Sequence, residues 1–378
     1  MAYVKFDRRS FLLSALLPAA VALSGVSAME TAQADDYSAG RVYTATNGTA
    51  GNEIVMYHRA ADGSLSAAGR VATNGLGSGG GLGNQSGLVL TKNGRWLFAV
   101  NAGSNEISVF SVRHGYPRLV DKVGSGGTRP VSLTVHGDLL YVLNGGDTNN
   151  ITGFNIGEWG KLSPIPNSTK PLSTAATGPA QIEFTPDGDT LVVTEKATQK
   201  IDLYTVEDGV ANGPAVRNSN GVTPFGFAFD KRGNLIVSEA FGGAPNQAAL
   251  SSYRVSEDDD DISVISPSVK DNQTAACWVV VTKNGRYAYT TNTGSGSISG
   301  YRVARDGTLS LLGDGLTAVI GAGTGPIDAA LSRNSRFLYV LNGGIGTVSG
   351  FRVESNGSLS PINSVGGLAP GANGLVAR

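Results

Sequence analysis

The chain has 378 residues, of which 53 are glycine and only 16% are charged, and its formal net charge is −1. This composition favours strands joined by tight turns over solvated helices. The near-zero charge gives no support to partners such as nucleic acid or an anionic membrane surface, and three histidines are too few and scattered for a histidine-built metal site. The single cysteine, Cys277, excludes an internal disulfide and lies in an apolar run typical of a buried thiol.

The first predicted element is an export signal over residues 1–34. Arg8 and Arg9 precede a mostly apolar run from Phe11 to Ala22, and a small-x-small cleavage signal follows at Ala32-Gln33-Ala34. The arginine pair favours the twin-arginine route, although an ordinary secretory signal that holds two arginines stays open. The apolar run is too short for a comfortable membrane span. We therefore expect a periplasmic or secreted protein without a stable membrane anchor.

Residues 35–378 repeat one pattern seven times and are predicted to form a single domain. In each copy a strand-like run ends at a turn, and an aliphatic residue followed three places later by an aromatic one comes next. These pairs are Ile54/Tyr57, Ile107/Phe110, Ile151/Phe154, Ile201/Tyr204, Leu250/Tyr253, Ile298/Tyr301 and Val348/Phe351. Short strands at a period of roughly 45–50 residues are typical of a β-propeller. The sequence therefore predicts an all-β fold, a seven-bladed β-propeller of four-stranded antiparallel blades.

The two ends of the repeat region predict how the ring closes. The last residues, Asn373-Gly374-Leu375-Val376-Ala377, look like a first strand, whereas residues 41–47 look like a second strand with no first strand before it. Pairing of the N- and C-terminal strands would complete one blade and remove two free sheet edges. We expect a monomer built on this closed ring.

Loops that enter the first strand and loops between the second and third strands should share one rim around the central channel, where a small-molecule ligand is expected. At the end of the second strand the seven equivalent residues are Asn47, Asn101, Asn144, Glu195, Glu239, Asn292 and Asn342. Five asparagines indicate a structural role at a turn, because asparagine tolerates left-handed backbone conformations. Glu195 and Glu239 break the pattern, either as acid and base or cation-holding carboxylates, or as solvated loop carboxylates.

The innermost strands carry a second set of candidates. Two residues into each first strand the equivalents are Gly87, Ser132, Gln181, Gly226, Trp278, Asp328 and Gly374. Gln181, Trp278 and Asp328 are the large or polar exceptions, so they are candidate ligand contacts, together with Asn144 on the same rim. Arg129 lies just before this region in its own blade. Core packing of Trp278 and a turn-capping role of Asp328 remain alternatives.

The segment Gly178-Pro179-Ala180-Gln181-Ile182-Glu183-Phe184-Thr185-Pro186-Asp187-Gly188, with Glu195 at the end of the next strand, resembles the seven-bladed lactonase family. That family includes bacterial 6-phosphogluconolactonases and fungal carboxymuconate cyclases. Its first-strand motif reads Gly-Pro-Arg-His before a glutamate. Glu195 matches the glutamate, whereas Ala180 and Gln181 replace the arginine and the histidine. A glutamine amide does not take up a proton near neutral pH and cannot serve as a general base.

Three functional hypotheses follow. The first is an exported lactone-hydrolysing or ring-opening enzyme, in which Glu195 or Glu239 activates water and Arg129 holds the carbonyl oxygen or an acidic group. The second is a non-catalytic extracytoplasmic propeller that binds a ligand, glycan or protein. The third is a quinoprotein or other cofactor enzyme, for which the sequence offers no cofactor motif. Neither a cofactor nor the substrate is specified by the sequence.

Overall fold

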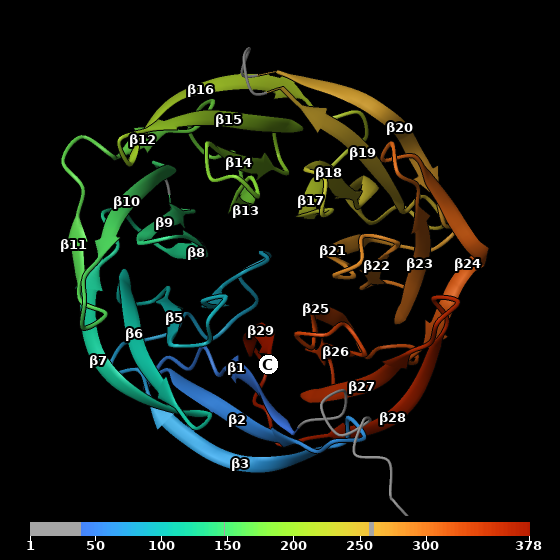
Figure 1. The fold of residues 1–378 in the computed structure, drawn as a ribbon, viewed down its shortest axis with the longest axis horizontal. Coiled ribbons are helices and arrows are strands. Elements are labelled where there is room, and N and C mark those ends of the chain that lie inside the picture. The colour runs from blue at the N-terminus through green and yellow to red at the C-terminus, as the bar shows by residue number, and fades with distance from the viewer. Residues whose placement is uncertain (1–38, 147, 257–260) are drawn as a thin grey trace, which may run out of the picture. The chain divides into compact units, whose positions relative to one another are not determined.

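The computed structural model describes residues 39–146, 148–256 and 261–378. These residues form seven antiparallel sheets arranged as blades in a ring (Figure 1). The predicted export signal lies outside the described residues. Within the described residues, no helix is long and apolar enough to cross a membrane.

The first three blades include the closing one, and each is given from its innermost strand outward. The first blade consists of β29 (Asn373–Ala377), β1 (Gly40–Ala45), β2 (Glu53–Arg59) and β3 (Leu65–Ala72). The second consists of β4 (Leu88–Leu90), β5 (Trp96–Asn101), β6 (Glu106–Arg113) and β7 (Tyr116–Gly124). The third consists of β8 (Pro130–His136), β9 (Leu139–Asn144), β10 (Asn150–Ile156) and an outer strand split into β11 (Leu162–Pro164) and β12 (Lys170–Pro171).

The remaining four blades are regular. The fourth consists of β13 (Pro179–Phe184), β14 (Thr190–Glu195), β15 (Lys200–Glu207) and β16 (Val210–Asn218). The fifth consists of β17 (Pro224–Phe229), β18 (Asn234–Glu239), β19 (Ala249–Val255) and β20 (Ile262–Lys270), with a 3-10 turn, η2 (Phe241–Gly243), after β18. The sixth consists of β21 (Ala276–Val281), β22 (Tyr287–Asn292), β23 (Ser297–Val303) and β24 (Leu309–Val319). The seventh consists of β25 (Pro326–Leu331), β26 (Phe337–Asn342), β27 (Thr347–Val353) and β28 (Leu359–Val365).

The predicted closure of the ring is confirmed. β29 pairs with β1 in antiparallel register, with Val42 opposite Ala377 and Tyr43 opposite Val376. Arg59 adds to this junction, because its Nε and Nη2 atoms each donate to the carbonyl oxygen of Arg378 at 3.1 Å. The first blade is therefore assembled from residues more than 300 positions apart in the sequence.

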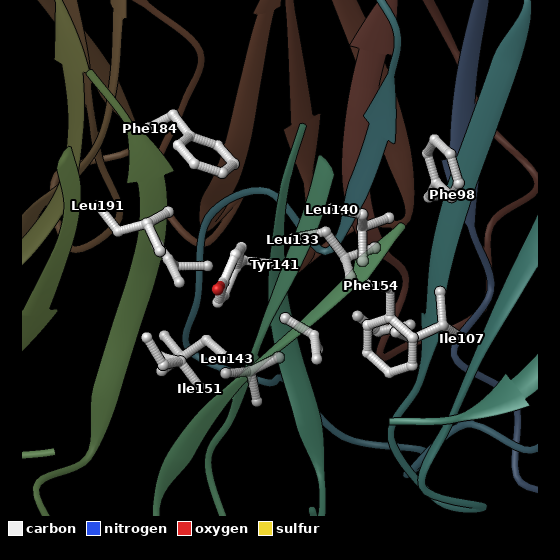
Figure 2. Packing of buried hydrophobic residues seen from close by; sticks show 14 of the residues in the cluster. Phe98, Ile107, Leu133, Leu140, Tyr141, Leu143, Ile151, Phe154, Phe184 and Leu191 are labelled. Carbon is white, nitrogen blue, oxygen red and sulfur yellow. The ribbon is translucent and has the colours of Figure 1, made fainter. Parts of the chain in front are cut away.

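The core lies between blades, where apolar side chains of adjacent sheets interdigitate. Figure 2 shows one such cluster, in which Leu133 and Leu140 of the third blade lie among side chains of the second and fourth. Buried tyrosines in second strands extend this packing to the next blade. The hydroxyl of Tyr289 donates to the carbonyl oxygen of Gly357 at 2.8 Å, and the hydroxyl of Tyr339 donates to that of Gly63 at 2.7 Å. Each bond satisfies a phenol that would otherwise be buried without a partner.

Candidate functional site at the channel mouth

The central channel is not empty, because the segment between β3 and β4 reaches into it (Figure 1). This segment spans residues 73–87 and is 15 residues long, whereas the connections that enter the other six blades span five to seven residues. Residues 82–87, which we call the plug, touch the inner strands of five other blades. The Gln85 side chain donates to the carbonyl oxygen of Val279 at 2.8 Å and accepts from the Val279 amide at 3.0 Å.

The plug also fixes Trp278. The indole N–H of Trp278 donates to the carbonyl oxygen of Asn84 at 2.7 Å, and the ring packs against Phe225 with ring centroids 4.9 Å apart. Only 4% of Trp278 is exposed. The Asn84 side chain bonds to Asn373 of β29 and to the carbonyl oxygen of Val131 of β8. The structure thus places Trp278 under the plug, as one of the residues that hold it.

Gln181 and Asp328 connect neighbouring inner strands. The Gln181 amide accepts from the Phe227 N–H at 2.7 Å and donates to the Phe227 carbonyl oxygen at 3.0 Å, so it acts as a short piece of pairing strand. The same amide donates to Glu183 at 2.8 Å, and burial raises the pKa of that carboxyl to about 8. Asp328 is buried, accepts from the Ala329 amide at 2.8 Å, and has a strongly raised pKa because of its burial.

In six of the seven blades the residue at the end of the second strand bonds to other parts of its own blade, an arrangement we call the clasp, whereas Asn47 bonds to Ser78 and Gly80 in the segment that enters the second blade. The Asn144 side chain donates to Ser125 in the connection that enters its blade, and to Asn150 of β10. Asn292 and Asn342 donate to Ser299 and Ser349 of their third strands, each at 2.8 Å. The structural role predicted for the asparagines is confirmed, but its predicted reason is wrong for four of the five, since only Asn47 has a positive φ. In Asn144, Asn292 and Asn342 the side-chain amide has a structural role because its hydrogen bonds cross-link two parts of the blade.

Glu195 and Glu239 occupy the same clasp and are both completely buried. The Glu195 carboxylate accepts from the Ser173 amide at 3.0 Å and from the Ser173 hydroxyl at 2.5 Å. Burial, with the adjoining Glu195, raises the pKa of Asp202 in β15. The Glu239 carboxylate accepts from the Ser251 and Ser268 hydroxyls at 2.5 and 2.6 Å. The two glutamates are therefore held in separate blades and are not solvated loop carboxylates.

A different residue, Lys196, lies at the channel mouth. Its Nζ atom donates to the carbonyl oxygens of Gly83 in the plug and Pro179, and it lies 4.7 Å from the centre of the Phe225 ring. Burial lowers the pKa of Lys196 to about 8, the nearby Cys277 opposes this shift, and the positive charge of Arg129 adds to it. Arg129 is exposed, and it lies near enough for its positive charge to act on Lys196.

A signal for Lys196 was present in the repeat. The residues equivalent to it, one after each second-strand end, are Gly48, Ala102, Gly145, Ala240, Thr293 and Gly343, all of them small. Reading the repeat one position further would have found this single long cationic side chain. Among the described residues, no group of three or more histidine, cysteine, aspartate or glutamate side chains is arranged to hold a metal ion.

Comparison with known proteins agrees with this architecture. Residues 43–171, which run from β1 to β12, match the family model described as Lactonase, 7-bladed beta-propeller. The predicted resemblance to the lactonase propellers is confirmed. No curated protein matches the chain.

Solved structures share the propeller over nearly their whole length. A putative 6-phosphogluconolactonase from Bacteroides fragilis NCTC 9343 is 19% identical, with 89% of this chain and 97% of that chain covered and a TM-score of 0.67. The Pseudomonas aeruginosa periplasmic gluconolactonase is 17% identical, with 90% and 99% covered and a TM-score of 0.68. A protein from Lactobacillus plantarum is 18% identical, with 89% and 99% covered and a TM-score of 0.72. At these identities the likeness shows the propeller fold of the chain and not its reaction.

Proposed function

We propose that this lactonase-type propeller opens a lactone by hydrolysis at the channel mouth. The observation that carries the proposal is the placement of the Lys196 Nζ atom between the carbonyl oxygens of Gly83 in the plug and Pro179, where burial lowers its pKa. A lysine with a pKa of about 8 is partly neutral near neutral pH, where a general base works best. Its neutral amine keeps two N–H groups for the carbonyls of Gly83 and Pro179 and still offers a lone pair.

Lys196 and Arg129 have different roles in the proposed chemistry. The neutral Lys196 amine removes a proton from a water molecule as that water attacks the lactone carbonyl carbon. The Arg129 guanidinium donates hydrogen bonds to the carbonyl oxygen, where negative charge develops. When the ring C–O bond breaks, the Lys196 ammonium returns its proton to the departing alkoxide. The product is a hydroxy acid, and water is the only co-reactant.

Glu195 is the competing base, since it matches the family glutamate. Its carboxylate is fully buried and accepts hydrogen bonds from Ser173 and Thr198, so its lone pairs are already engaged. Lys196 has a free lone pair when it is neutral, and its Nζ atom contacts Gly83 of the plug. The geometry therefore favours Lys196 as the base and a structural role for Glu195.

A matched pair of variants separates the two bases. Lys196→Met keeps the length of the side chain and removes its basicity, so lactone hydrolysis by the mature protein should fall by about two to four orders of magnitude. Glu195→Gln should change turnover by no more than a few-fold and should lower the melting temperature instead. Rates are measured by titrating the acid released from a panel of γ- and δ-lactones. The reverse pattern would assign the base to Glu195.

A non-catalytic binding propeller is the second candidate. It is favoured by Gln181, which stands where the resemblance expects a histidine and whose amide is bound to the Phe227 backbone. A wild-type protein that hydrolyses none of the lactones, yet melts at a higher temperature in the presence of one of them, would support this candidate over the enzyme.

We also propose that the protein acts outside the cytoplasm, as a monomer without a stable membrane anchor. The arginine pair and the cleavage signal of residues 1–34 support export. The existence of a periplasmic gluconolactonase with the same fold is compatible with it.

A further inference from the structure

A basic groove lies on the outer part of the ring between the second and third blades, away from the channel mouth. It has a volume of about 650 Å³ and is formed by the start of β5, the turn between β6 and β7, and the turn between β10 and β11. Six of its side chains matter here: Arg95, Arg113, Tyr116, Arg118, Trp159 and Lys161. Figure 1 shows β7 and β11 side by side at this edge of the ring.

Two aromatic faces line the groove and are open to solvent. Trp159 is 68% exposed and Tyr116 is 54% exposed. The turn that carries Trp159 packs closely on the second blade, because Gly160, with φ +78°, sits against the Trp96 ring, where an added Cβ would come within 2.5 Å of it. The Arg41 guanidinium lies 5.1 Å from the centre of the Tyr116 ring. The backbone of the Trp159 turn and the Tyr116 ring therefore have defined packing partners at the edge of the groove.

The charge of the groove has one sign. None of its lining residues is acidic, and within the described part of the chain no salt bridge engages Arg113, Arg118 or Lys161. Arg95 lies over the Trp96 ring at 4.9 Å and donates to the carbonyl oxygen of Glu158 at 3.2 Å, which fixes its position. In a protein with a net charge of −1, four unneutralised cations around two exposed rings favour an anionic ligand with flat faces.

We propose that this groove binds an acidic oligosaccharide built from uronic acid residues. The C–H face of a pyranose ring stacks on an aromatic face such as that of Trp159, and the arginine fork pairs with a carboxylate through two parallel hydrogen bonds. A run of uronic acids presents both features at every residue. The groove is independent of the proposed lactone chemistry, because none of its residues lies at the channel mouth.

The molecule contains a natural control for simple attraction of polyanions. A second basic groove of about 460 Å³, between the fifth and sixth blades, is lined by Lys231, Arg232, Arg286, Arg302 and Arg305. It has at least as many cations, but its lining includes no aromatic residue. Ligand binding driven by charge alone would use both grooves, whereas the proposed ligand requires the aromatic faces.

The test uses the mature protein and a short oligogalacturonate, followed by isothermal titration calorimetry and by the fluorescence of Trp159. Trp96 also lines the groove but is only 9% exposed, and Trp278 is 4% exposed, so the ligand-dependent change in emission should come mainly from Trp159 and should be largely lost in Trp159→Ala. Trp159→Ala and the double variant Arg113→Gln/Arg118→Gln should each weaken binding about tenfold or more. Arg232→Gln/Arg305→Gln should leave binding unchanged. All three variants alter exposed side chains, and their melting temperatures should match the wild type.

Three results would overturn the proposal. One is the absence of binding by the wild type. Another is equal weakening by the two arginine double variants, which would mean non-specific attraction. The third is equally tight binding of a single-stranded oligonucleotide or an acidic peptide of the same charge, which would assign the groove to another class of partner. Methyl-esterified oligogalacturonate, which keeps the sugar rings and loses the charge, should bind at least tenfold more weakly.

Discussion

The residue at the end of each second strand bonds to other parts of the chain, and its chemistry sets what its neighbours must be. Asn101 can both donate to Ser108 at 2.8 Å and accept from Thr73 at 2.8 Å, because an amide carries both functions. A carboxylate only accepts, so Glu239 is surrounded by donors, the hydroxyls of Ser251 and Ser268. Glu195 has Asp202 where four other blades have serine, and the raised pKa of Asp202 favours protonation of one carboxyl of this pair.

The proposed roles of Arg129 and Lys196 predict a linked change in rate and pH dependence. Arg129→Gln removes the donor to the carbonyl oxygen, so turnover should fall by about two orders of magnitude. It also removes a positive charge that lowers the pKa of Lys196, so the rising limb of the pH–rate profile should move to higher pH. Arg305→Gln, an exposed cation in another blade, is the matched control. A lower rate with an unmoved pH profile would separate Arg129 from Lys196.

Around the plug, side-chain amides form the hydrogen bonds that a neighbouring strand would otherwise form. The inner edges of β17 and β21 lie at the channel, and the amides of Gln181 and Gln85 pair with Phe227 and Val279 there much as a peptide group would. Gly226 makes room, since an added Cβ would lie 2.1 Å from the Gln85 side chain. Gln85 of the plug and Gln181 of β13 therefore satisfy backbone groups that an open channel would leave to water.

The closing strand predicts the largest loss of stability. Deleting residues 373–378 removes β29 with its pairing to β1, the Asn373–Asn84 bond to the plug and the carbonyl that binds Arg59. We expect a loss of several kcal/mol and a melting temperature lower by about 10 °C, or aggregation through the freed edge of β1. Thermal melting followed by circular dichroism, with size-exclusion chromatography, measures both outcomes. Arg378→Ala keeps the strand and serves as the control, and unchanged melting of the truncated chain would contradict the role of β29.

For the whole molecule, buried carboxyls set the dependence of stability on pH. Burial raises the pKa values of Glu183, Asp202, Glu239, Asp271 and Asp328 in the folded protein. The folded state therefore binds more protons than the unfolded state between the ordinary carboxyl pKa and these raised values, and stability falls as pH rises through that window. Carboxyls with lowered pKa values, such as Asp187 and Glu106, have the opposite effect on stability, and they exert it at pH values below this window.

We accordingly expect the free energy of unfolding in urea to be larger at pH 5 than at pH 8. Asp202→Asn should reduce this difference, because the amide needs no proton beside Glu195. Asp306→Asn, at a fully exposed turn position, should leave it unchanged. Equal stability at the two pH values would show that these carboxyls remain ionised in the folded protein.

The sequence by itself determined the blades, their strands and the closure of the ring. Six of the seven predicted second-strand ends, among them Asn101, Glu195 and Asn342, are the last residues of their strands, and the seventh, Asn47, lies two residues beyond the end of β1. Alternating apolar residues and turn residues are local signals, and seven copies of each reinforce one another. The closure of the ring could also be predicted, because residues 41–47 look like a second strand without a first strand, and residues 373–377 supply the missing one.

Only the tertiary structure decided what each exceptional side chain does. Gln181, Glu195 and Trp278 stand out in the repeat, yet their partners, Phe227, Ser173 and Asn84, are brought to them by the packing of the chain and by the plug. A repeat shows that a position is unusual, but it does not say whether the side chain meets water or another strand. That depends on contacts across the ring, such as those of residues 82–87, which no local pattern encodes.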